Sequence, residues 1–115
     1  MTNMPQIDTP VTYLSGKALN WAVGRCLGQD VSHENGHVNW AVLSTFAPAT
    51  FAAQALPLIE AARLSVYPGT ELGWWARQAG VNTVLAHGST LLEAAMRCIV
   101  MSFVGNTMSV PEELL

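Results

Sequence analysis

The segment HENGH, from His33 to His37, matches the H-E-x-x-H pattern of zinc hydrolases. In those enzymes a helix places the two histidines on one face, and the glutamate deprotonates a water bound to the metal. Asn35-Gly36 instead favours a two-residue hairpin turn, because both positions accept the positive φ of a type I′ turn. Such a hairpin pairs Glu34 with His37 and His33 with Val38. We therefore expect a hairpin here and no metal or other cofactor, with His33 and His37 kept as the alternative ligands of a metal-dependent hydrolase.

A second group of reactive residue types consists of His87, Arg97 and Cys98. A cysteine nucleophile needs a basic group within hydrogen-bond reach. Cys98 follows a mostly apolar stretch of helix, which favours a buried and inert thiol. Arg97 is expected to pair with Glu93, four residues earlier, or to bind the backbone carbonyls of another element.

Ionisable residues are scarce in the chain. It has five Lys and Arg, eight Asp and Glu, and a net charge of −3. It contains no phosphate-binding glycine motif and no G-x-S-x-G nucleophile motif. Half of the residues are hydrophobic, which together with the low charge indicates some exposed apolar surface. These features favour a non-catalytic protein that binds an unknown protein partner, with a homodimer as one form of that binding.

Trp74 and Trp75 are the candidate binding residues for such a partner. They lie next to each other in a segment with strand-like composition. Side chains alternate along a strand, so the two tryptophans must point to opposite faces of the sheet. One is expected in the core and the other near the surface, where it would contact the partner.

Nucleic acid is disfavoured as a partner. Proteins that bind nucleic acid usually gather Lys and Arg on one face, because phosphate contacts supply most of their affinity. The five basic residues here are scattered singly along the chain. A weak nucleic-acid-binding protein that uses Arg25, Arg63 and Arg77 stays as an alternative.

The cysteines and the apolar runs indicate where in the cell the protein is expected to be. Cys26 and Cys98 are not spaced as C-x-x-C, and no secretory signal precedes them. We expect two reduced thiols in a cytoplasmic protein. The longest apolar run, residues 90–104, is shorter than the roughly 20 residues of a membrane span and contains Glu93 and Arg97, so no membrane segment is expected.

Residues 90–104 predict the central helix of the fold. Thr90 and Glu93 form a capping box, in which the glutamate would return to the Thr90 amide. Gly105 supplies a residue that accepts the left-handed conformation after the last turn. An amphipathic helix is expected at residues 16–27, with Lys17, Asn20 and Arg25 facing solvent. Its apolar face is expected to pack on the central helix.

The remaining pattern predicts a three-stranded antiparallel meander from residue 64 to residue 87, with a turn at Pro68-Gly69 and a break at Ala79-Gly80. In the apolar stretch 41–63, Pro57 is expected in the first turn of a short helix that ends at Ala62. Residues 49–55 form a separate helical turn in this interpretation. The fold class is therefore α+β: a small antiparallel β-sheet with two main helices packed on one face, plus an accessory β-hairpin. We expect one domain, residues 1–115, with a loose N-terminal arm (1–11) and an extended acidic tail (106–115).

Two blocks of sequence resemble the NinX-like family of phage and prophage proteins. The first, LSGKALNWAVGRCLG, covers residues 14–28, and the second covers residues 87–115. The matching positions of the second block are Gly88, Thr90, Leu92, Ala94, Ala95, Met96, Arg97, Cys98, Val110, Pro111, Glu113 and Leu114. Together with weaker similarity near residues 58–60 and 75–76, the resemblance covers about half of the chain. It implies a phage origin, a bacterial host cell and kinship in fold, and it assigns no catalytic residue.

Overall fold

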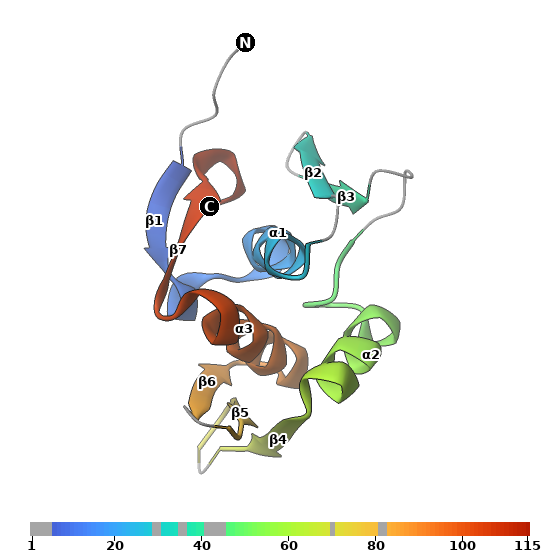
Figure 1. Ribbon diagram of the computed structural model, residues 1–115, viewed down its shortest axis with the longest axis vertical. Helices are drawn as coiled ribbons and strands as arrows, with labels where there is room; N and C mark the ends of the chain where they lie inside the picture. The colour runs from blue at the N-terminus through green and yellow to red at the C-terminus, as the bar shows by residue number, and fades with distance from the viewer. Residues whose placement is uncertain (1–5, 29–30, 35–36, 41–45, 70, 81–82) are drawn as a thin grey trace.

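The computed structural model describes residues 6–28, 31–34, 37–40, 46–69, 71–80 and 83–115 (Figure 1). Within these residues it has three α-helices and three small antiparallel sheets, which confirms the α+β class. In chain order the elements are β1 (Gln6–Pro10), the 3₁₀ turn η1 (Val11–Tyr13), α1 (Gly16–Cys26), β2 (Val31–Glu34), β3 (His37–Trp40), α2 (Ala52–Ala62), β4 (Leu64–Pro68), β5 (Trp74–Gln78), β6 (Val84–Gly88), α3 (Leu91–Val104), β7 (Thr107–Pro111) and the 3₁₀ turn η2 (Glu112–Leu114).

Helix α3 is the centre of the molecule. It lies on one face of the β4–β5–β6 meander, and α1 packs against the other side of α3 (Figure 1). Both main helices are therefore on the same side of the sheet, as expected. The apolar core fills the space between α1 and α3 and contains Leu19, Val23, Met96, Ile99 and Val100.

Both ends of α3 are marked by the residues that the sequence indicated, with two differences in detail. The Thr90 hydroxyl accepts from the Glu93 amide at 3.1 Å. The Glu93 carboxylate accepts from the Ser89 amide at 3.0 Å, and so returns one residue earlier than the expected capping box. Gly105 has a positive φ of 81°, but its ψ of −141° is not that of the left-handed helical region. Both bonds still satisfy amides at the start of the helix.

The two terminal segments are paired with each other, so residues 6–10 of the expected loose arm lie in a strand. β1 and β7 form an antiparallel ribbon in which Gln6 pairs with Pro111 and Pro10 with Thr107. The hydrophobic side chains of the tail explain the difference, because Val110 is fully buried against the core. Apolar residues in an acidic tail therefore decide its position. Within the tail, Thr107–Pro111 are a strand and Glu112–Leu114 form a 3₁₀ turn, and both are part of the packed structure.

The segment before the meander also differs from expectation. α2 is one helix from Ala52 to Ala62, and Pro57 lies inside it rather than in its first turn. Proline has no N–H, so the carbonyl of Ala53 loses its helical partner. Ala53 is exposed, and water can replace the missing donor.

Asn20 corrects the expected outer face of α1, because it is buried. Its Oδ1 accepts from the Ala49 amide at 2.8 Å. An unpaired backbone amide is costly to bury, and Asn20 supplies the partner for this one. The side chain therefore ties α1 to the chain that leads into α2.

Candidate functional site

The candidate site is the face of the β4–β5–β6 sheet that points away from α3. No described element packs on this face (Figure 1). The strand register places Tyr67, Trp75 and His87 in one row across the three strands. The neighbouring row consists of Ser65, Arg77 and Leu85. We call these six residues the outer sheet face.

The aromatic row is held in place by local contacts. The rings of Trp75 and His87 meet edge to face, with 4.8 Å between their centroids and 63° between their planes. Two glycines of the β4–β5 connection make room for them. A Cβ at Gly73 would lie 2.5 Å from Nε2 of His87, and one at Gly69 would lie 3.4 Å from Nε1 of Trp75. These contacts constrain the side chains of Trp75 and His87 within the row.

The outer sheet face is accessible and carries few charges. Tyr67 is 40% exposed and Leu85 is 44% exposed. Trp75 is partly buried, and Arg77 is exposed. Arg77 is the only permanently charged residue among the six, and none of them is acidic. Such a surface can stack planar groups, bury apolar side chains and donate to a carboxylate.

Trp74 and Trp75 lie on opposite faces of β5, as the alternation of strand side chains predicted. Trp74 faces α3 and packs against a small cluster formed by Ala76, Ala86, Ala94 and Cys98. Trp75 lies on the outer sheet face. Both indoles are partly buried rather than fully exposed. Their part in binding a partner stays a prediction, and the geometry directs it to Trp75.

The group at the junction of β6 and α3 is a structural clamp. Arg97 donates from Nε to the Leu14 carbonyl at 2.9 Å and from Nη1 to the His87 carbonyl at 2.9 Å. Its Nη1 also lies 3.2 Å from the Glu93 carboxylate. These contacts confirm both interactions expected of Arg97. The bonds reach the backbone of His87 and not its ring.

Cys98 lies on a different side of α3 and packs under the sheet, where its Sγ donates weakly to the Val84 carbonyl at 3.8 Å. Burial raises the pKa of its thiol from 9.0 to about 11. Burial likewise raises the pKa of Cys26 from 9.0 to about 11. The thiolate is the reactive form of cysteine, so neither residue is prepared for nucleophilic chemistry.

The thiols should therefore react slowly in the native protein. At pH 8 we expect Ellman's reagent to modify the native chain about 100-fold more slowly than the urea-unfolded chain. The reason is that a two-unit rise in pKa lowers the fraction of thiolate about 100-fold. The raised pKa values also predict stability that is complete below pH 9 and falls as the pH rises toward 11, since unfolding then releases the thiol protons. Equal modification rates in both states would contradict the inertness of the thiols.

The three residues of the HENGH segment that the structure describes lie in strands. His33 and Glu34 belong to β2, and His37 begins β3. The register pairs Glu34 with His37 and His33 with Val38, which confirms the expected hairpin pairing. The turn residues Asn35 and Gly36 lie outside the described residues. The helical spacing that a zinc hydrolase needs is therefore missing, and the hydrolase alternative loses its geometric basis.

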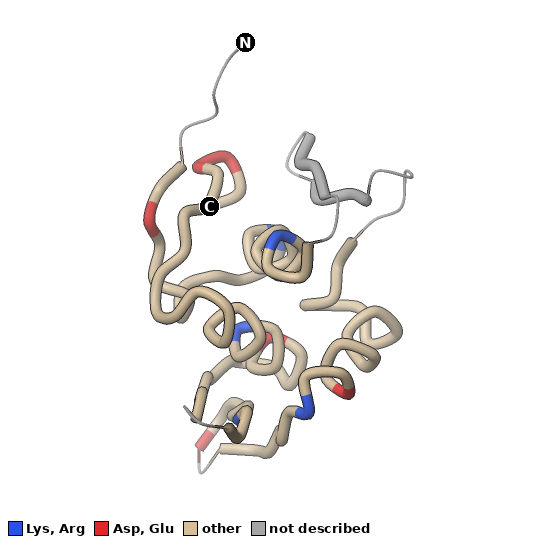
Figure 2. The backbone as a smooth tube through the Cα atoms, in the orientation of Figure 1, with Lys and Arg blue, Asp and Glu red and all other residues tan. Residues whose placement is uncertain are grey.

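The three arginines of the nucleic-acid alternative belong to different elements. Arg25 lies near the end of α1 over the ring of Trp21, with 5.7 Å between its Cζ and the ring centroid. Arg63 caps α2 in the left-handed conformation, with φ 55° and ψ 49°. Arg77 is on the outer sheet face. The Lys and Arg positions are spread over the molecule (Figure 2), so they form no continuous basic face.

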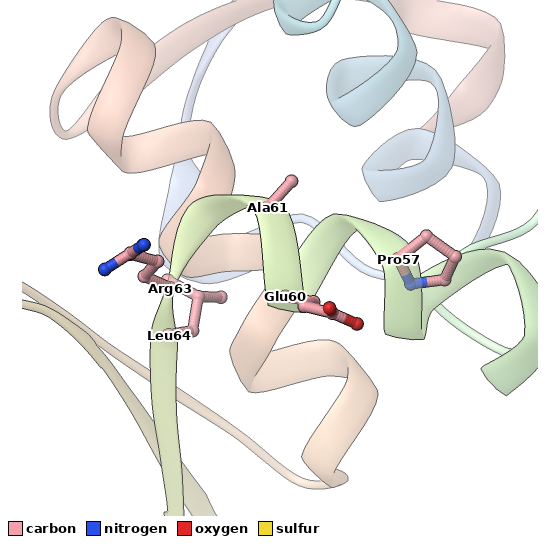
Figure 3. Close-up of a pocket in the computed structure, with 5 residues that line it drawn as sticks. All are labelled: Pro57, Glu60, Ala61, Arg63 and Leu64. Atoms are coloured by element: carbon pink, nitrogen blue, oxygen red, sulfur yellow. The ribbon is translucent and has the colours of Figure 1, made fainter.

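The hollow beside α2 offers no paired charges. Pro57, Glu60, Ala61, Arg63 and Leu64 line it. The side chains of Glu60 and Arg63 point away from each other across this open surface (Figure 3). We therefore do not assign it a function.

Comparison with protein families decides the origin of the chain. The family described as "Bacteriophage P22, NinX" matches residues 10–102. The chain belongs to the NinX family. The matched range includes both the segment at 14–28 and the start of α3, and it includes the whole outer sheet face. Strand β7 lies beyond it, so the similarity at Val110 to Leu114 is not part of this match.

Two other observations complete the comparison. The search among curated proteins found no match. Of the helices that the structure describes, none has the length and apolarity needed to cross a membrane. NinX-family membership thus establishes a phage-derived protein, and the site has to be interpreted from its own geometry.

Sequence reasoning identified Trp75 but not its neighbours in the row. Tyr67 and His87 were expected in the first and third strands of the meander, and Arg77 in the second. The strand register could have shown that these residues share one face. Every second residue of a strand belongs to the same face, and short turns limit how neighbouring strands can be aligned. The sequences of the β4–β5 and β5–β6 connections do not determine how the three strands align, so the register could not be predicted.

Proposed function

We propose that this NinX-family protein is a non-catalytic interaction module that binds a protein partner of its phage or host through the outer sheet face. The observation that carries the proposal is the ordered row of Tyr67, Trp75 and His87 on a sheet face that no described element covers. The expectation of a binding role for Trp75 is thereby extended to a defined surface. Trp74, which faces α3, contributes by supporting the strand.

The physical case rests on the cost of ordering side chains at an interface. Immobilising a flexible side chain opposes binding, and aromatic side chains have few rotatable bonds. Trp75 is already held between His87 and Gly69, so little of its freedom remains to be lost. Trp, Tyr and Arg are also the residue types that most often dominate binding energy. The outer sheet face contains one of each.

Charge favours a different protein over a second copy of this chain. A two-fold symmetric dimer uses the same patch on both subunits. The outer sheet face would then bring Arg77 to a surface that offers no carboxylate among its own six residues. A partner that presents an acidic residue beside an apolar one complements this face better. Nucleic acid would need several cations in reach of its phosphates, and the face supplies only Arg77.

The proposal can be tested by retention of partners from a lysate of phage-infected bacteria. Tagged wild-type protein should retain one protein in stoichiometric amount, with or without nuclease. The double variant Tyr67→Ser/Leu85→Ser should lose at least about 90% of it, since the changes remove exposed contact area from both edge strands of the face. The matched control Tyr13→Ser/Leu115→Ser changes the same two residue types at more exposed positions elsewhere; Tyr13 is 75% exposed and Leu115 is 55% exposed.

Two results would contradict the proposal. Equal retention by the two double variants would show that the outer sheet face does not bind the partner. Retention that disappears with nuclease would assign the binding to nucleic acid instead. Size-exclusion chromatography with light scattering on the same three proteins would separate a homodimer from a complex with another protein.

A further inference from the structure

A cavity of about 340 Å³ lies between α2, the second half of α3 and the ends of α1 and β5. It is separate from the outer sheet face, because it lies on the helical side of the sheet. Its walls are mostly aliphatic and contain no charged residue. The lining residues are Leu27, Leu58, Ala61, Ala62, Gln78, Ile99, Ser102 and Phe103.

Each of the two polar side chains of the cavity has one donor engaged. Gln78 donates from Nε2 to the Ala62 carbonyl at 3.0 Å. An amide oxygen could not occupy that position beside a carbonyl, so Nε2 is the bonded atom, and Gln78 keeps its acceptor Oε1 and the second hydrogen of Nε2. Ser102 donates its hydroxyl proton to the Ile99 carbonyl at 2.6 Å and keeps its lone pairs. The side chains at the cavity therefore offer two acceptor atoms, Oε1 of Gln78 and Oγ of Ser102, and one donor, the second hydrogen of Gln78 Nε2.

The size of the cavity suits a small molecule. Binding sites for small ligands usually have volumes of about 300–1,000 Å³, with apolar walls and a few placed polar groups. An entrance is available at the rim, where Ser102 and Phe103 are exposed. A charged ligand would lose its hydration here without a counter-charge among the lining residues. A neutral ligand with no donor would leave Gln78 Oε1 without a partner.

From these features we infer that the cavity binds a small neutral molecule with a compact apolar body and one hydrogen-bond donor. The apolar body lies between Leu58 and Ile99, and the donor bonds to Oε1 of Gln78. Indole has this chemistry and serves as a probe. Benzofuran is the matched control, because it has nearly the same shape and carries an oxygen where indole has its N–H.

The first experiment titrates each probe into the ¹⁵N-labelled full chain and follows the amide resonances by NMR. Indole should bind with a Kd of the order of 0.5 mM, as expected for a fragment of its size. The shifted resonances should be those of Ala62, Gln78 and Ile99. Benzofuran should bind at least about fivefold more weakly, because it has no donor for Oε1 of Gln78. This comparison requires no variant.

Two variants assign the binding to the cavity. Gln78→Leu removes the acceptor and should lower the affinity for indole to that for benzofuran, while benzofuran is unaffected. Ala62→Leu places extra methyl groups in the cavity and should weaken both probes at least about fivefold. Ala53→Leu is the control for the second variant, because it makes the same change at an exposed position of the same helix. Thermal melts of each variant verify that it is folded.

Three results would overturn the inference. The first is no indole binding up to several millimolar, and the second is a set of shifts on the outer sheet face instead of the cavity. The third is equal affinity for indole and benzofuran in the wild type, which would remove the role of Gln78. A second copy of the chain could also fill the cavity through Phe103, and the protein would then be dimeric in solution. A dimer that indole dissociates is consistent with binding of indole in the cavity. A dimer that excludes indole overturns the inference.

Discussion

Replacing Arg97 by alanine is expected to destabilise the protein by about 3 kcal/mol, because it removes a charged donor from three acceptors at once. The guanidinium joins α3 to η1 through the Leu14 carbonyl and to β6 through the His87 carbonyl. Its side chain is only 12% exposed, so water would replace these bonds poorly. Glu93 would also lose its ion-pair partner. The melting temperature should fall by roughly 10 °C or more.

The geometry of the clamp distinguishes arginine from any other cation. Arg97→Lys keeps the charge but cannot donate to two separate carbonyls in a fixed fork, so it should recover less than half of the lost stability. Arg77→Ala is the matched control on the exposed face and should change stability by less than about 0.5 kcal/mol. Chemical denaturation measures all three. A loss below about 1 kcal/mol for Arg97→Ala would show that the clamp contributes little.

The second large effect is expected at Gly88, where the last residue of β6 meets α3. A Cβ there would lie 2.5 Å from the Ala94 amide nitrogen and 3.0 Å from the Ala94 Cα. These are backbone atoms, so no side chain can move aside to admit the methyl group. Gly88→Ala should therefore force the strand away from the helix and destabilise the protein by about 3 kcal/mol.

Gly80 supplies the control for this substitution. A Cβ at Gly80 meets nothing within 4 Å, and the residue lies in the connection between β5 and β6. Gly80→Ala should leave the melting temperature within about 2 °C of wild type or raise it slightly, since alanine reduces the freedom of the unfolded chain. Similar melting temperatures for the two variants would show that β6 and α3 can separate without loss.

The parts of the fold that could be predicted from the sequence are those that depend on neighbouring residues. Thr90 and Glu93 mark the start of α3 because the cap and its partner are three residues apart. Asn35-Gly36 predicted the pairing of Glu34 with His37, since a two-residue turn leaves only one register. The adjacent tryptophans predicted a strand with two different faces.

The parts that could not be predicted depend on contacts between distant residues. The polarity of Asn20 indicated an outward side chain, but its partner is the amide of Ala49, which only the folded chain brings near. Pro57 normally marks a helix start, and the exposed position of the Ala53 carbonyl allows it inside α2 instead. For the candidate site, the sequence identified Trp75, while the row around it required the strand register.

The pairing of β1 with β7 also bears on when the protein can fold during its synthesis. Gln6 pairs with Pro111, so almost the entire chain lies between the two partners. Val110 and Leu114 complete a core that already contains Val11 and Leu14. On the ribosome, the first strand must therefore wait unpaired until β7 has left the exit tunnel. Closing so long a loop is also a slow step in folding. The newly made chain should accordingly expose Val11 and Leu14 to proteases and chaperones until β7 and η2 have emerged.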